Sequence, residues 1–192
     1  GSRMFREGGN TYCSRVCCMY ATKQARQYKE KHPEADVYIF YMDIRAFGKG
    51  FEQFYQNAKA MGINFIKGKV AKIDEDPESH DLFVTVEAIG DGGTKQKNRH
   101  DMVVLALGLV PATDPRTIMS SIKVAKDGFI DSPEIKLNPT QTSVEGVFAG
   151  GVAIGPKDIV DTIIEGSAAA MTAANYLNLN FNEKKSLSEK IV

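Results

Sequence analysis

The first third of the chain shows two kinds of hydrophobic pattern, one helical and one strand-like. Apolar residues recur at helical spacing over residues 13–31, after a turn-like Gly-Gly-Asn and before Pro33, and predict a helix there. Residues 36–42 (DVYIFYM) form a short apolar run rich in β-branched and aromatic side chains, which is typical of a buried strand. Residues 51–61 place apolar positions on one helical face and are followed by Gly62, so a second helix is expected.

The middle of the chain contains short strand-like segments separated by turns. Apolar runs at residues 63–66, 70–73 and 82–88 predict three strands of a small antiparallel meander. The glycine-rich turn IGDGGT then joins the last of these to a further predicted strand at 102–107. We expect this fourth strand to return to the main sheet.

The last part of the chain combines turns with one long helix. Residues 108–146 are rich in proline and turn residues and predict only short strands. A final short strand at 147–149 is expected to lead into a glycine-rich loop and a helix over 159–177, and the polar residues 181–192 are expected to form a flexible tail. A helix between strands, followed by more strands and helices, indicates an α/β fold with an open sheet.

Charge and composition narrow the function classes. The 24 basic and 24 acidic residues cancel, so nothing predicts a broad attraction to nucleic acid or to an anionic membrane. The apolar runs are far shorter than the roughly 20 residues that a membrane span needs, and no leader for export is recognisable. Three clustered cysteines do not suit a disulfide framework, so a reducing cytoplasm is the expected location.

The three cysteines, Cys13, Cys17 and Cys18, lie close together at the start of the first predicted helix. On a helix the first two would share a face and the third would lie about 100° further round, so three sulfurs could converge on one helix end. A helix N-terminus also favours thiolates, which suggests a metal site. The alternative is that these cysteines are small buried hydrophobic residues. The three histidines show no ligand spacing: His32, His80 and His100.

Residues 146–161 (GVFAGGVAIGPKDIVD) form the second candidate site. The glycines allow the backbone to approach a flat or charged ligand, and the following helix directs its free N–H groups toward the same space. Lys157 adds a cation at this entrance. The alternative is an ordinary loop between a strand and a helix, with no ligand.

Taken together, three segments resemble a known family. The pattern D-x-V-V-L-A-x-G-x-x-P at 101–111, followed by the glycine loop and its helix, is similar to the carboxyl part of flavin disulfide reductases with two dinucleotide-binding domains. Within that superfamily, the chain resembles the heterodisulfide reductase A proteins and their relatives in four segments: GSR, YCSRVCCMYA, YMDIRAFGKG and GPKDI. These proteins are flavin- and iron-sulfur-containing electron carriers. The resemblance extends from residue 1 to about residue 177.

The resemblance implies a division into domains. Residues 1–107 would be a Rossmann-like NAD(P)-type domain with a β-meander, and residues 108–180 the carboxyl part of a FAD-binding domain, before the tail at 181–192. No G-x-G-x-x-G opens the first helix, where the cysteines stand instead, so a nicotinamide site is not expected.

The resemblance also implies two cofactors. Cys13, Cys17 and Cys18 would be three ligands of a [4Fe-4S] cluster, with the fourth cysteine just before the GSR segment. FAD would lie beside seven residues of the glycine loop: Gly150, Gly151, Gly155, Pro156, Lys157, Asp158 and Ile159. One departure is Val152, which stands where flavin disulfide reductases usually carry an aspartate; Lys157 would contact the isoalloxazine edge instead. Both cofactors are expected to be absent or partial in this chain alone.

We therefore expect part of an electron-transferring oxidoreductase that is inactive by itself. The whole protein would pass electrons between FAD, [4Fe-4S] clusters and partner subunits, with no catalytic side chain in these residues. The alternative is a non-catalytic docking or dimerisation module, in which the cysteines and the glycine loop serve packing only and a homodimer is formed. An NAD(P)-dependent disulfide reductase is disfavoured, because the redox-active Cys-x-x-Cys and the pyrophosphate loop are missing.

Overall fold

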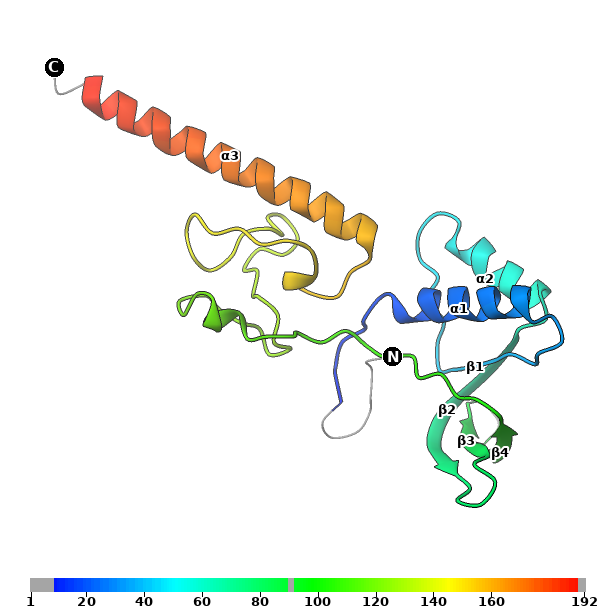
Figure 1. Cartoon of the computed structure of the whole chain (residues 1–192). Coiled ribbons are helices and arrows are strands. Elements are labelled where there is room, and N and C mark those ends of the chain that lie inside the picture. The colour runs from blue at the N-terminus through cyan, green and yellow to red at the C-terminus, as the bar shows by residue number, and fades with distance from the viewer. Residues whose placement is uncertain (1–8, 90–91, 190–192) are drawn as a thin grey trace. The chain divides into compact units, whose positions relative to one another are not determined.

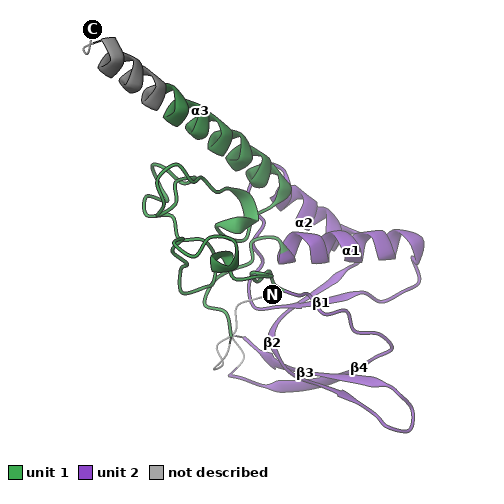
Figure 2. Cartoon of the chain, turned by 60° about the vertical axis from the view of Figure 1, so that its left-hand side comes forward, with its two compact units in different colours: residues 1–16, 108–192 green, residues 17–107 purple. Residues whose placement is uncertain are grey.

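The computed structural model describes residues 9–89 and 92–189, with side chains up to residue 178 at the carboxyl end. The chain divides into two compact units (Figure 2). Unit 1 comprises residues 1–16 and 108–192, and unit 2 comprises residues 17–107. The division therefore falls just before Cys17 and just after Leu107.

Unit 2 is built on a mixed sheet of four strands in the order β1-β2-β3-β4 (Figure 1). The strands are β1 (Tyr38–Tyr41), β2 (Asn64–Glu75), β3 (Leu82–Ala88) and β4 (Lys95–His100). β1 pairs with β2 in parallel, and β2, β3 and β4 form an antiparallel meander. The structure confirms the α/β class and an antiparallel meander, but the meander is built partly from other strands than those predicted.

Two helices of unit 2 lie side by side, α1 (Cys17–Lys31) and α2 (Phe51–Ala60). The Arg26 guanidinium lies 4.3 Å from the centre of the Phe54 ring, which joins the two helices by a cation–π contact. Tyr55 of α2 is buried, and its ring meets Phe65 of β2 edge-on at 4.8 Å. An amphipathic helix thus covers the parallel part of the sheet through its apolar face.

The first helix begins four residues later than predicted, at Cys17 rather than Cys13. Arg15 has a φ of 63°, a left-handed conformation that cannot continue a right-handed helix. The Val16 N–H donates to the Ser14 carbonyl over 2.7 Å and closes a tight turn. The expectation that Cys13 and Cys17 share a helical face is therefore wrong.

β2 is one long strand where two short ones were predicted, and Gly68 lies within it. A Cβ at Gly68 would come 2.4 Å from Val86 Cγ1 and 3.0 Å from the Glu87 carbonyl oxygen. The glycine therefore permits close approach of β2 and β3 instead of breaking the strand.

Gly68→Ala is expected to lower the free energy of unfolding by about 1–3 kcal/mol, because the buried, β-branched Val86 has little room to move. Urea denaturation followed by circular dichroism measures this loss. The matched comparison is the same substitution in a Val86→Ala background, where Cγ1 is gone and the loss should be smaller. An equal loss in both backgrounds would contradict the packing argument.

The strand predicted at 102–107 is not a strand in the structure, because β4 occupies that place in the sheet. β4 follows the glycine turn directly and pairs with β3 along its whole length. Within unit 2 the 102–107 segment has no assigned strand pairing, and Met102, Val104 and Leu107 are about 70% exposed. Strand geometry needs a hydrogen-bonding neighbour, and an apolar pattern alone does not supply one.

Unit 1 is mostly irregular up to its long helix, α3 (Ile159–Glu189). Two short 3₁₀ helices, η1 (Pro115–Thr117) and η2 (Gly151–Ala153), interrupt the irregular part. The strand predicted at 147–149 is reduced to a single bridge between Gln141 and Phe148. α3 continues past residue 177 because the following residues include neither proline nor glycine up to its end. None of the helices, within the described residues, is long and apolar enough to cross a membrane.

Candidate functional site

The three predicted cysteine ligands fall on both sides of the unit boundary. Cys13 precedes α1 and belongs to unit 1, whereas Cys17 and Cys18 form the first turn of α1 in unit 2. All three are free thiols. Among the residues that the structure describes, no three Cys, His, Asp or Glu side chains are gathered as a metal site.

Cys17 and Cys18 are brought together at the start of α1, and this changes the acidity of Cys17. Its pKa is lowered to about 6, chiefly by a hydrogen bond from the Cys18 side chain, while burial opposes the shift. Cys18 Sγ also lies 3.7 Å from the backbone oxygen of Asp43. Free N–H groups at a helix N-terminus favour a thiolate in the same way. The lowered pKa favours the thiolate of Cys17, the state in which sulfur binds iron.

Cys13 lies in a segment that is anchored within unit 1. The Tyr12 hydroxyl donates to the Leu109 carbonyl oxygen over 2.8 Å, and the Leu109 N–H donates to Ser14 Oγ over 2.7 Å. Burial raises the pKa of Tyr12, so its hydroxyl keeps its proton. The Tyr12 ring also meets the buried Phe129 edge-on at 5.6 Å. Both neighbours of Cys13 are thus fixed to the backbone of the same residue.

The glycine loop lies close against α3, and two of its glycines allow that approach. A Cβ at Gly150 would lie 3.0 Å from the Glu165 carbonyl oxygen, and one at Gly151 would lie 2.7 Å from Thr162 Cγ2. Gly155, with a φ of 153°, faces open space. Two of the three predicted flavin glycines therefore have a packing role in the structure, and Gly155 leaves room for a ligand.

Lys157 and Asp158, predicted beside the flavin, both have partners within unit 1. Lys157 Nζ lies 3.1 Å from Glu165 Oε1, and the side chains are only 10% and 20% exposed. The second carboxylate oxygen of Glu165 accepts the Gly151 N–H over 2.8 Å. Asp158 Oδ1 accepts the Asp161 N–H over 2.8 Å and so caps α3. The lysine thus neutralises a carboxylate that braces the loop.

The remaining flavin candidates lie at the surface of unit 1. Ile159, the first residue of α3, is 78% exposed, whereas Gly155 and Pro156 are half-buried. A flat ligand could lie against this surface and meet the N-terminal N–H groups of α3. The residues present therefore fit the edge of a flavin site. The three thiols are of the chemical type that binds iron-sulfur clusters, but the described residues do not gather them as a site.

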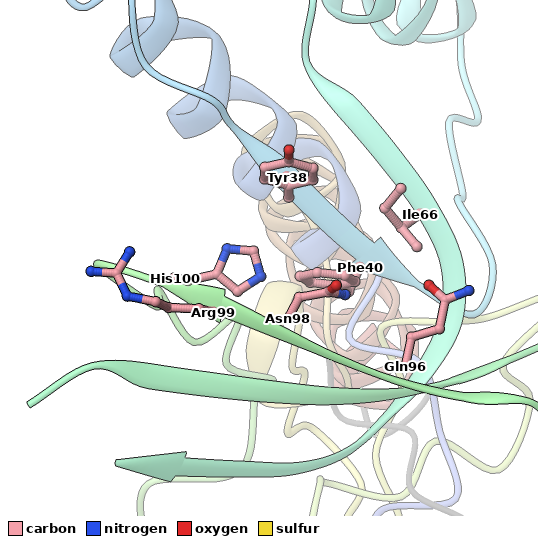
Figure 3. Close-up of a pocket in the computed structure, with 7 residues that line it drawn as sticks. All are labelled: Tyr38, Phe40, Ile66, Gln96, Asn98, Arg99 and His100. Atoms are coloured by element: carbon pink, nitrogen blue, oxygen red, sulfur yellow. The ribbon is translucent and has the colours of Figure 1, made fainter. Parts of the chain in front are cut away.

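Unit 2 also contains a pocket of about 310 Å³ that sequence analysis missed (Figure 3). It is lined by residues of β1, β2 and β4: Tyr38, Phe40, Ile66, Gln96, Asn98, Arg99 and His100. The His100 ring meets the Tyr38 and Phe40 rings edge-on at 5.4 and 5.5 Å. Its Nε2 is buried and has no hydrogen-bond partner among the described residues.

The pocket lining combines two aromatic rings with polar side chains, among them the imidazole of His100, and includes no carboxylate among the described residues. Arg99 is held by Asp81 and Asp101 at 2.7 and 3.0 Å. The signal in the sequence was the alternation of Gln96, Asn98 and His100, which places three polar side chains on one face of β4. That alternation is inconspicuous because the intervening residues are polar as well.

Comparison with solved structures supports the fold. Thioredoxin reductase from Lactococcus lactis matches with a TM-score of 0.58 at 20% identity, over 82% of this chain and 49% of that one. This likeness confirms the predicted α/β fold class.

Comparison with curated sequences identifies closer relatives, although no family model matches the chain. One A-type iron-sulfur subunit of the CoB–CoM heterodisulfide reductase of Methanopyrus kandleri is 44% identical over 171 residues, covering 88% of this chain and 26% of that protein. The A-type subunit of the H₂:CoB-CoM heterodisulfide, ferredoxin reductase of Methanothermobacter marburgensis is 46% identical over 170 residues, covering 86% and 25%. The chain spans about a quarter of the length of these relatives. By its sequence, the chain is homologous to that quarter of the heterodisulfide reductase A proteins.

Proposed function

We propose that this chain is part of an electron-transferring flavin and iron-sulfur oxidoreductase of the heterodisulfide reductase A type. The whole protein would pass electrons between FAD, [4Fe-4S] clusters and partner subunits in the cytoplasm. The observation that carries the proposal is the placement of Cys17 and Cys18 together in the first turn of α1, in a chain that is 44% identical over 171 residues to an iron-sulfur subunit. The proposed domains are residues 1–107 as the NAD-domain equivalent and 108–180 as the carboxyl part of the FAD domain, whereas the compact units of the structure group the segment before Cys17 with the second part.

Cys13, Cys17 and Cys18 are the proposed ligands of one [4Fe-4S] cluster, with a fourth thiolate from outside these residues. The cluster would accept and release one electron at a time. The contribution of this chain is to present thiolates at the start of α1. The lowered pKa of Cys17 means that iron binding near neutral pH would have to displace less proton from this thiol than from an ordinary one.

The proposed flavin surface comprises the loop residues from Gly150 to Ile159. Flavin takes up two electrons and can release them singly, which suits transfer to clusters. The chain's own residues would orient the ring: Gly155 leaves space, and the Lys157–Glu165 pair braces the loop behind it. A contact from Lys157 to the isoalloxazine edge would compete with its ion pair to Glu165.

One observation favours the docking module as a second candidate. Several apolar side chains of α3 are between 59% and 78% exposed: Ile159, Val160, Ile163, Ile164, Met171 and Leu177. Such a stripe on a helix is suited to a protein partner. In this alternative the cysteines would be retained for packing only.

Anaerobic reconstitution with iron and sulfide separates the two candidates. A polypeptide that extends upstream of residue 1 is expected to become brown and to bind about four irons per chain. Cys17→Ser should reduce the bound iron strongly, whereas His32→Gln, which changes an exposed residue, should not. A colourless protein, or iron that is insensitive to Cys17→Ser, would leave the docking module as the better description.

A further inference from the structure

The segment that carries Cys13 is joined to α3 by a side chain that the cluster and flavin proposals do not use. Arg15 pairs its guanidinium with the carboxylate of Asp161, in the first turn of α3. Its own backbone N–H donates to Cys13 Sγ over 3.3 Å. Arg15 therefore contacts the thiol with its backbone and the helix with its side chain.

The backbone of Arg15 is held in an unfavourable conformation. Its φ of 63° is rare for a side chain of this size, because the left-handed region crowds Cβ against the following carbonyl oxygen. Such a conformation persists when surrounding contacts fix it. On one side these are the Tyr12 and Ser14 hydrogen bonds to Leu109, and on the other the ion pair with Asp161.

Asp161 in turn lies beside the glycine loop. Its N–H is capped by Asp158, and the next residue, Thr162, is the one that limits space at Gly151. All of these residues belong to unit 1. A continuous set of contacts thus runs from Cys13 through Arg15 and Asp161 to the loop at the start of α3.

We propose that Arg15 is a positioning residue, whose ion pair with Asp161 fixes Cys13 relative to the glycine loop. The functional meaning rests on the proposed function: a cluster ligand and the flavin surface would be held at a constant separation, as transfer of electrons between them requires. Arg15 acts here through Cys13 and α3, not by touching a cofactor.

The test needs neither iron nor flavin. Hydrogen exchange of the Leu109 and Val16 amides, which donate to Ser14, is measured by NMR in the 192-residue protein. Arg15→Asn removes the charge and introduces a residue that tolerates positive φ, and Asp161→Asn removes the other charge with little change of shape. Each is expected to speed exchange at both amides by about two- to fivefold, since an exposed ion pair contributes about 0.2–1 kcal/mol. The double variant should add nothing further.

Three comparisons make the result specific. Arg15→Lys keeps the charge and should keep exchange slow. Arg116→Asn removes a different ion pair of unit 1, with Asp114, and should leave both amides unchanged. The buried amides of Val84 and Val86 in unit 2 should not respond, which separates a local link from general loss of stability.

The link is refuted if Asp161→Asn leaves both amides unchanged, or if the effects of the two single variants add in the double variant. Because the measurement is made without cofactors, it is independent of the reconstitution experiment. Slow exchange that depends on Arg15, together with an upstream-extended polypeptide that stays colourless on reconstitution, would keep the link and reject the cluster proposal.

Discussion

Replacing Cys18 by alanine is expected to raise the pH at which Cys17 becomes reactive from about 6 to about 8 or above. The lowered pKa depends chiefly on the hydrogen bond from the Cys18 side chain, and alanine removes it. Burial, which raises the pKa, would then act with less opposition. The thiolate of Cys17, populated above about pH 6 in the wild type, would form only in more alkaline solution.

The measurement is the pH dependence of iodoacetamide alkylation at Cys17, localised by fragmentation mass spectrometry. The midpoint is more informative than the rate at one pH, because a thiolate of higher pKa is intrinsically more nucleophilic and partly offsets its lower abundance. Cys18→Ser retains a hydroxyl donor and should give an intermediate midpoint. A midpoint that stays near 6 in Cys18→Ala would show that the helix N-terminus, not Cys18, sets the acidity.

The same shift bears on cluster assembly. Iron-sulfur ligation requires thiolates, so metal uptake at an ordinary thiol is accompanied by proton release and weakens as pH falls. A Cys17 pKa of about 6 moves that proton loss below neutral pH. The neighbouring Tyr20 behaves consistently: burial first, and then negative charge on Cys17 and Cys18, raises the pKa of its phenol.

Hydrophobic periodicity predicted the helices and strands whose position depends only on burying one apolar face. The helix starting at Phe51 and the strand Leu82–Ala88 lie where the pattern placed them, since each buries one apolar face. β4 was missed because its residues, KQKNRH, are all polar, and its place is set by the turn before it and by β3 beside it. The apolar 102–107 segment shows the opposite case: it has the pattern of a strand but no assigned strand pairing within unit 2.

Local backbone exceptions explain the other differences. No propensity rule predicts a left-handed arginine, so the start of α1 was placed at Cys13 rather than Cys17. The cysteines and the glycine loop could be chosen from sequence because few residue types serve their chemistry. The partners of Lys157 and Arg15 could not, because Glu165 and Asp161 come within reach only when the loop packs on α3.

Gly151→Ala is expected to be the most destabilising small substitution in unit 1, at roughly 2–4 kcal/mol. The residue has a φ of 65°, which costs an L-amino acid about 1–2 kcal/mol, and its new Cβ would meet Thr162 Cγ2 at 2.7 Å. A shifted loop would also lose the Gly151 N–H bond to Glu165 and, with it, the support of Lys157. Urea denaturation followed by circular dichroism measures the loss.

Gly166→Ala is the matched control, because it makes the same chemical change within α3, where a Cβ meets nothing within 4 Å. It should stabilise the protein by up to about 1 kcal/mol, through helix propensity. Thr162→Ser added to Gly151→Ala removes Cγ2 and keeps the hydroxyl that bonds Asp158, so it should recover the part of the loss due to crowding and not the part due to φ. If both glycine variants were equally stable, the loop would not depend on close packing against α3, and its glycines would be better explained by a ligand.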